Sequence, residues 1–219
     1  MKENKKRTEA ITLSAIMIAF AIAISAICAV IPFLNLPFGG GFTIASMLPI
    51  ILVAYMYGTK WGLLTAFVYS VMQMILGFNT VSAFFLPGDS QMLWWKAVLV
   101  ILIDYVIAYT VLGLGGIFRK KFSPTKAIVL GSIFAISLRY IAHIISGAIF
   151  FGAWAEWFFT QDGFYSWGQN ILNSFSGGSL ALVYSIIYNG TYMIPEIIIT
   201  AIVACLVVRI PQIKMRDEI

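Results

Sequence analysis

Long apolar stretches alternate with short polar connections along the whole chain. A helix needs about 20 mostly apolar residues to cross a hydrocarbon layer about 30 Å thick, and several of these stretches reach or approach that length. The pattern predicts six helical segments, at roughly 8–33, 42–57, 61–77, 94–118, 126–152 and 178–208. We therefore expect an all-α integral membrane protein in which residues 1–219 form one domain, a bundle of six transmembrane helices.

The connection between Ala153 and about Gly177 is rich in aromatic residues. Such a composition is typical of an aromatic belt at the membrane interface, or of a lid, rather than of a free linker. Its aromatic residues are Trp154, Trp157, Phe158, Phe159, Phe164, Tyr165 and Trp167.

Basic residues make the net charge +5, but they are not spread evenly. Most of the 14 Lys and Arg residues lie before Ala10, between Arg119 and Lys126, and after Val208. The alternate connections carry Asp89, Glu156 and Asp162 instead. Because positive charge favours the cytoplasmic side, this distribution predicts that both termini are cytoplasmic, and it indicates topology rather than nucleic-acid binding.

Metal and cofactor sites are not expected. Cys28 and Cys205 each lie alone in an apolar run, and neither has metal-ligand spacing to the single histidine. The chain also lacks a Walker A pattern, so it carries no nucleotide site of that kind.

Asp104, Arg139, His143 and Glu196 lie inside the apolar segments, where an ionisable side chain is costly. Counting inward at about 1.5 Å per residue from the outer end of each helix places Asp104 at roughly 15 Å and His143 at roughly 14 Å. The same count places Asn189 at roughly 17 Å and Glu196 at roughly 27 Å. Asp104, His143 and Asn189 therefore share one level in the outer half. Arg139 and Glu196 are expected to have structural or coupling roles, in which they pair either with each other or with backbone groups.

Helical spacing collects further residues at that level. Arg139, His143, Gly147 and Phe151 recur every four residues and share one face of their helix. Tyr184 and Tyr188 are also four apart and are followed by Asn189. A carboxylate, an imidazole, an amide and aromatic faces suit a planar cationic ligand. The competing interpretation is that Asp104 neutralises Arg139, and that His143 and the tyrosines serve only to pack the helices.

The first segment carries a strip of small residues at four-residue spacing, Ala15, Ala19 and Ala23. Such a strip permits close approach of another helix. The spacing alone does not separate packing within this chain from docking of another membrane subunit.

Four stretches resemble one family, the thiamine-specific substrate-binding (S) components of bacterial energy-coupling factor transporters. They are GGFTIASMLPI at 40–50, IDY at 103–105, RYIAHIISGAIFFG at 139–152 and YSIIYNGTYMIPE at 184–196. The resemblance covers nearly the whole chain and implies a six-helix bundle in the bacterial plasma membrane. The family often has Glu and Trp at the positions of Asp104 and Phe151.

The resemblance implies that thiamine is held in the outer half by residues on three helices. The ligand-binding residues expected on this basis and from the spacing are Asp104, Tyr105, His143, Gly147, Phe151, Tyr184, Tyr188 and Asn189. It also implies that the strip formed by Ala15, Ala19 and Ala23 docks on a transmembrane coupling subunit driven by two cytoplasmic ATPase subunits. The chain itself is then expected to be a binding subunit and not an enzyme.

The sequence is also compatible with other functions. An S component for another vitamin, riboflavin or biotin, would share the architecture. A proton-coupled carrier would use the four buried ionisable residues as a relay, although no internal repeat supports this. An intramembrane enzyme is disfavoured because the single histidine has no cysteine or second histidine near it in the sequence.

Overall fold

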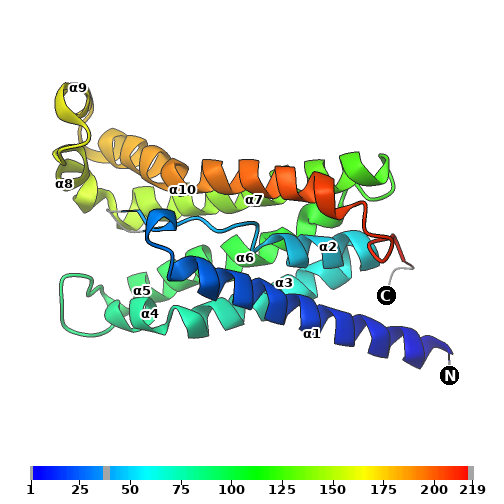
Figure 1. Ribbon diagram of the computed structural model, residues 1–219. Helices are drawn as coiled ribbons and strands as arrows, with labels where there is room; N and C mark the ends of the chain where they lie inside the picture. Colours follow the sequence, from blue (N-terminus) through cyan, green and yellow to red (C-terminus); the bar gives the residue numbers. More distant parts are fainter. Residues whose placement is uncertain (1, 37–39, 217–219) are drawn as a thin grey trace.

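The structure, a computed structural model, describes residues 2–36 and 40–216. All regular elements in these two ranges are helices, so the expected all-α class is confirmed. Figure 1 shows their arrangement. In chain order they are α1 (Lys2–Ala29), η1 (Pro32–Leu34), α2 (Leu48–Tyr57), α3 (Thr59–Leu76), α4 (Phe78–Ala83), α5 (Trp94–Ile101), η2 (Leu102–Ile107), α6 (Ala108–Thr110), η3 (Val111–Gly116), α7 (Pro124–Phe150), η4 (Gly152–Trp154), α8 (Ala155–Phe159), α9 (Tyr165–Ser174) and α10 (Gly177–Val207).

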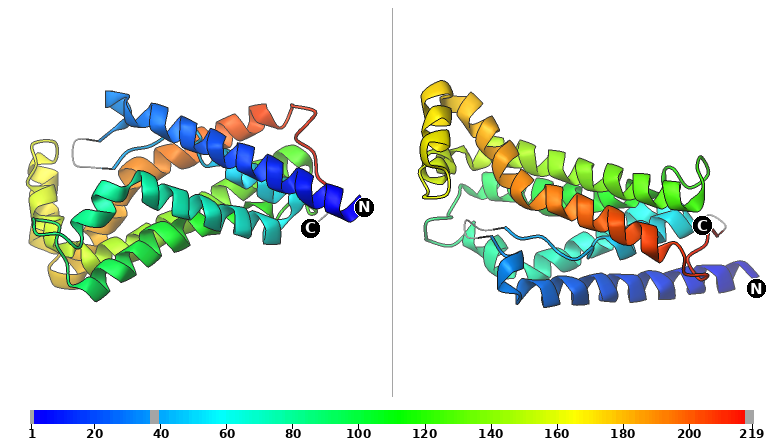
Figure 2. Two further views of the ribbon diagram at one scale, coloured as in Figure 1. Left: turned by 90° about the horizontal axis from the view of Figure 1, so that it is seen from below. Right: turned by 45° about the horizontal axis from the view of Figure 1, so that its top comes forward.

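Four helical stretches of the described chain are long and apolar enough to cross a membrane. They are Glu3–Ala29, Trp94–Gly116, Pro124–Phe150 and Gly177–Val207. Helices α2 and α3 run beside them, and the start of α1 and the end of α10 lie at the same end of the bundle (Figures 1 and 2). Helices α8 and α9 lie across the opposite end, which we call the α8 end.

The stretch Trp94–Gly116 is not one regular helix. It changes from α-helical to π-helical at Leu102–Ile107, returns to α for Ala108–Thr110 and ends as a 3₁₀-helix. A π-helical turn widens the helix and alters which side chains share a face. Asp104 and Tyr105 lie in this turn, so its geometry decides where both side chains point.

Glycines allow the central helices to pack closely. A Cβ atom on Gly113 would lie 2.4 Å from the backbone nitrogen of Leu63, and one on Gly131 would lie 2.0 Å from the carbonyl oxygen of Gly115. Such contacts are impossible for a larger residue, so η3 meets α3 and α7 backbone to backbone. Close approach through small residues is the usual way in which helices associate in lipid.

The connection between η1 and α2 enters the bundle without forming a helix. Residues 45–47 are buried, and α2 begins partway along the bundle (Figure 1). Irregular backbone at membrane depth requires polar partners from the protein. Glu196 of α10 supplies one, because its carboxylate accepts hydrogen bonds from the Thr43 backbone nitrogen at 2.5 Å and from Thr43 Oγ1 at 2.8 Å.

This contact gives Glu196 a structural role. We expect Glu196→Gln to lower the free energy of unfolding by about 1–3 kcal/mol, because an amide has one acceptor oxygen where the carboxylate has two. Thermal unfolding of the purified protein in detergent measures the effect. The exposed Glu156→Gln variant is the matched control, and equal melting temperatures for the two variants would refute the role.

Candidate functional site

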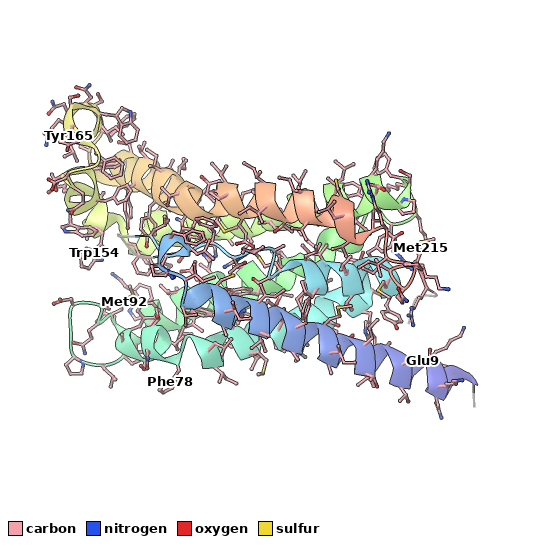
Figure 3. All side chains as sticks on the ribbon, in the orientation of Figure 1. Glu9, Phe78, Met92, Trp154, Tyr165 and Met215 are labelled. Atoms are coloured by element: carbon pink, nitrogen blue, oxygen red, sulfur yellow. The ribbon has the colours of Figure 1, made fainter. Side chains whose placement is uncertain are left out.

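A cavity of about 520 Å³ opens among the π-helical turn, α7 and α10 at the α8 end of the bundle. Figure 3 shows Trp154, one of its lining residues, at this end, opposite Glu9 and Met215. Aromatic rings form most of the lining, and Asp104 contributes the carboxylate. The full lining comprises Gly40, Thr80, Phe84, Ser90, Val100, Asp104, Tyr105, Tyr109, His143, Gly147, Phe151, Trp154, Trp157, Tyr184, Tyr188, Asn189 and Tyr192.

All eight residues expected from the sequence as ligand contacts line this cavity. They come from three separate stretches: the π-helical turn supplies Asp104 and Tyr105, the end of α7 and the residue after it supply His143, Gly147 and Phe151, and α10 supplies Tyr184, Tyr188 and Asn189. The fold thus brings the eight together around one space large enough for a small organic molecule.

Asp104 and His143 form the polar centre of the lining. Asp104 Oδ1 lies 2.8 Å from His143 Nδ1, and Ser146 Oγ donates to Asp104 Oδ2 at 2.7 Å. Because an ionised carboxylate only accepts hydrogen bonds, Nδ1 carries the proton and Nε2 of a neutral ring is left as an acceptor. His143 Nε2 is buried without a hydrogen-bond partner in the described part of the chain. The pair therefore places a carboxylate at the cavity wall, while the acceptor Nε2 of His143 is buried behind the wall.

Asn189 is held by its neighbours on two helices. Its Nδ2 donates to the carbonyl oxygen of Ser185 at 2.8 Å and to that of His143 at 3.3 Å. Its Oδ1 accepts a hydrogen bond from the hydroxyl of Tyr192. These contacts link α10 to α7 and set the orientation of the amide at the cavity wall.

Gly147 has two effects on the site. It lines the cavity, as expected for a residue that leaves space for a ligand. A Cβ atom at this position would also lie 2.2 Å from Ser185 Oγ and 3.2 Å from Asn189 Nδ2. The glycine therefore permits α7 and α10 to approach each other at the level of the site.

Tyrosine rings on α10 form a continuous aromatic wall. The centroids of Tyr184 and Tyr188 are 5.5 Å apart, and those of Tyr188 and Tyr192 are 6.1 Å apart. Phe158 of α8 packs behind this wall, with its ring centroid 5.4 Å from that of Tyr184 and 5.6 Å from that of Tyr188. Such faces attract cations through their quadrupoles.

Several lining residues lie outside the set that sequence reasoning selected. Tyr192 continues the four-residue spacing of Tyr184 and Tyr188, so extending that series would have identified it. Tyr109 follows Asp104 by five residues, a spacing that shares a face in a π-helix and not in an α-helix. The other lining residues outside the set are Gly40, Thr80, Phe84, Ser90, Val100, Trp154 and Trp157, of which only the two tryptophans belong to the aromatic connection noted in the sequence.

Removing the Tyr192 hydroxyl tests whether the orientation of Asn189 matters for ligand affinity. Tyr192→Phe removes the hydrogen bond that orients Asn189, so we expect ligand affinity to fall about fivefold to tenfold, the effect of about 1 kcal/mol. Tyr140→Phe is the control, because the Tyr140 hydroxyl donates to Ile186 at 2.6 Å and does not line the cavity. Equal ligand affinities of the Tyr192→Phe and Tyr140→Phe variants, measured by equilibrium binding, would show that the Tyr192 hydroxyl does not contribute to ligand binding.

Arg139 lies behind the cavity and does not line it. Its guanidinium carbon lies 4.3 Å from the centroid of the Tyr109 ring, and its amino groups donate to the Tyr109 hydroxyl and to Met47 Sδ. Asp104 is bonded to His143 and Ser146 instead, and Glu196 holds Thr43. Neither acid forms a direct ion pair with Arg139 within the described ranges, although the charges of Arg139 and Glu196 lie close enough to act on each other.

The small-residue strip on α1 faces outward. Ala15, Ala19 and Ala23 are all exposed, so they do not pack within the described part of this chain. In the most apolar 18 residues of α1, only 17% of the residues are buried, compared with 28–33% in the other three long stretches. The strip is therefore free to contact lipid or another protein.

Metal binding finds no support in the geometry. Across residues 2–36 and 40–216, no three side chains of His, Cys, Asp or Glu are grouped so that they could hold an ion.

Comparison with known proteins assigns the family. The sequence model of the family described as "Thiamine transporter protein" matches residues 15–176. The thiamine transporter ThiT of Bacillus subtilis (strain 168) is 31% identical over 233 residues, and the match covers 100% of both chains. A solved structure of ThiT from Listeria monocytogenes has a TM-score of 0.63 and 20% identity, covering 96% of this chain and 100% of that one, which shows the same fold.

These findings confirm the resemblance stated from the sequence, and the relatives are transport proteins and not enzymes. With its several apolar helices, the protein is a multi-pass protein of the bacterial plasma membrane. The chain belongs to the thiamine transporter protein family.

Proposed function

We propose that this protein is the thiamine-binding S component of an energy-coupling factor transporter, and that the cavity at the α8 end captures thiamine from outside the cell. The observation that carries the proposal is the cavity itself. Among the described residues that line it, the one carboxylate is that of Asp104, which is paired with His143 and surrounded by aromatic rings, within a chain of the thiamine transporter family.

The cavity chemistry suits thiamine, which joins a cationic thiazolium ring to an aminopyrimidine. Asp104 neutralises the positive charge, and the wall formed by Tyr184, Tyr188 and Tyr192 provides faces for cation–π attraction. His143 and the Asn189 amide line the cavity and supply hydrogen-bonding groups for the aminopyrimidine. The carboxylate, the aromatic faces and the hydrogen-bonding groups thus match the positive charge, the flat rings and the aminopyrimidine of thiamine.

The charge distribution supports an outward-facing cavity. In the proposed topology, six segments cross the membrane, with the short α2 and α3 forming an inner helical hairpin. Arg119, Lys120 and Lys121 then lie on the side of both termini, whereas Asp89 and Glu156 lie at the α8 end with the cavity. By the positive-inside rule the termini are cytoplasmic and the cavity opens outward.

The exposed strip on α1 supports a membrane partner. We place the contact with a transmembrane coupling subunit, driven by two cytoplasmic ATPase subunits, at Ala15, Ala19 and Ala23. Small exposed side chains at four-residue spacing allow another helix to approach closely.

The partner contact has a test of its own. Ala19→Leu is expected to leave thiamine affinity unchanged and to abolish most ATP-driven uptake in proteoliposomes that contain the whole transporter. Val98→Phe, on the exposed face of α5, is the control for adding several carbon atoms at a lipid-facing position. Full uptake by the Ala19→Leu transporter would contradict the placement of this interface.

Tryptophan fluorescence tests the ligand, because Trp154 and Trp157 line the cavity. Titration of the purified protein with thiamine is expected to give saturable quenching, whereas riboflavin and biotin give none. Saturation by riboflavin or biotin in place of thiamine would assign the protein to another vitamin. Uptake by this protein alone, driven by a pH gradient in liposomes, would support a proton-coupled carrier instead.

A further inference from the structure

Helix α9 and its flanks form an outward surface that the proposed function leaves unused. Figures 1 and 2 show α9 lying across the α8 end of the bundle, beyond the end of α10 and outside the long helices. It does not line the cavity, although α8, to which it is joined, packs on the cavity wall through Phe158. The position is that of a helix lying parallel to the membrane surface.

The side chains of α9 form a buried strip and an exposed polar strip, with one large aromatic side chain on each of the two flanks between them. Gly168, Ile171 and Leu172 turn inward and are fully or partly buried. On the opposite side Ser166, Asn170 and Asn173 are exposed at helical spacing. Between these strips lie two large aromatic side chains, Tyr165 with 76% and Trp167 with 49% of their surface exposed.

Trp167 is held rigidly although it is exposed. Its ring stacks on that of Phe164 with the centroids 5.5 Å apart and the planes at 20°, and it lies 6.2 Å from the ring of Phe159. A fixed and half-exposed indole has one apolar face and one polar N–H group. Indoles of this kind are enriched where hydrocarbon meets the lipid headgroups.

The charge pattern indicates which kind of surface covers this region. No charged residue occurs between Asp162 and Glu196, a stretch that includes all of α9. Attraction to anionic lipid therefore does not hold α9, and its uncharged amide and hydroxyl groups match the hydrogen-bonding headgroup layer. The exposed side chains of Phe175, Leu182 and Ile186 continue the apolar surface from the end of α9 along α10, a helix that is long and apolar enough to cross the membrane.

We infer that α9 is an interfacial helix that lies in the headgroup layer of the outer leaflet, with Trp167 as its anchor. The anchored helix then holds α8, whose Phe158 supports Tyr184 and Tyr188 of the cavity wall. The lipid contact goes beyond the proposed function, and its test reads membrane depth, so failure of thiamine binding would leave it standing.

Site-directed spin labelling tests the depth of α9 in phosphatidylcholine bilayers. Ser174→Cys places a nitroxide on the Trp167 side of α9, seven residues away, and Ser166→Cys places one on the polar strip. Asp89→Cys, in an exposed loop at the same end, is the aqueous control. The exposed Cys205 is replaced by alanine, and the buried Cys28 is kept.

The label at position 174 is expected to collide with oxygen severalfold more than with a water-soluble nickel complex, and the labels at positions 166 and 89 to show the reverse. A label at position 174 that matches position 89 would overturn the inference. Quenching by brominated phosphatidylcholine is a second measurement that needs no label. The Trp167→Phe variant should lose a measurable part of the fluorescence quenching that the brominated lipid causes in the unchanged protein. Equal quenching of the two proteins would also overturn the inference.

Discussion

Asp104→Asn is expected to weaken thiamine binding by about 30-fold or more. Removing one partner of a buried charge pair typically costs about 2–5 kcal/mol, and about 1.4 kcal/mol corresponds to a factor of ten in affinity. The loss has two sources. The cationic ring loses its neutralising carboxylate, and the new amide nitrogen meets a hydrogen-bond donor, either His143 Nδ1 or Ser146 Oγ.

Isothermal titration calorimetry of the purified variant measures this effect directly. Asp162→Asn is the matched control, because Asp162 is exposed and does not line the cavity. Melting temperatures measured without ligand separate a binding defect from a folding defect. Unchanged thiamine affinity in a folded Asp104→Asn protein would show that the negative charge of Asp104 does not contribute to binding.

Gly147→Ala is expected to have the second large effect, on the structure of the site as well as on binding. The added methyl group would lie 2.2 Å from Ser185 Oγ, so α7 and α10 must separate or Ser185 must move. Overpacking of this kind typically costs about 1–3 kcal/mol. Because Asn189 bridges the same two helices, affinity should fall together with stability.

A second substitution tests whether this clash is the cause. Ser185→Gly removes both side-chain atoms that the new methyl group would meet on Ser185, so the double variant should recover most of the lost melting temperature. Gly178→Ala is the control for replacing a glycine in an α-helix, because nothing lies within 4 Å of a Cβ atom there. A double variant no more stable than Gly147→Ala alone would show that another contact is responsible.

The sequence identified much of the site because helical periodicity is a local property. The four-residue spacing from Arg139 to Phe151 and the pair Tyr184 and Tyr188 follow from 3.6 residues per turn. Depth counting placed Asp104 and His143 at one level, and these side chains are hydrogen-bonded across two helices. In each case the sequence distance along a regular helix carried the information.

The remaining features depend on irregular backbone, which periodicity does not describe. Tyr109 reaches the lining after a π-helical turn whose position no residue pattern marks. The contact from Glu196 to Thr43 joins residues 153 positions apart through a non-helical segment inside the bundle. For this reason the sequence indicated a structural or coupling role for Glu196 and suggested Arg139 as a partner, but it did not indicate the contact with Thr43.

Arg139 illustrates the same limit. Its four-residue spacing from His143 placed it on the same face of the helix, and its charge suggested an acidic partner. The guanidinium instead stacks on Tyr109 and donates to Met47, because both nearby acids are already engaged with other donors. Which acid pairs with which donor is decided by three-dimensional proximity and not by the order of charges along the chain.

A structure of the protein crystallised with thiamine tests the central claim most directly. We predict thiamine inside the cavity at the α8 end, with its thiazolium ring beside Asp104, its aminopyrimidine hydrogen-bonded by His143 or Asn189, and a ring face against the tyrosine wall of α10. Thiamine bound elsewhere on the protein, with this cavity empty at saturating concentration, would contradict the account.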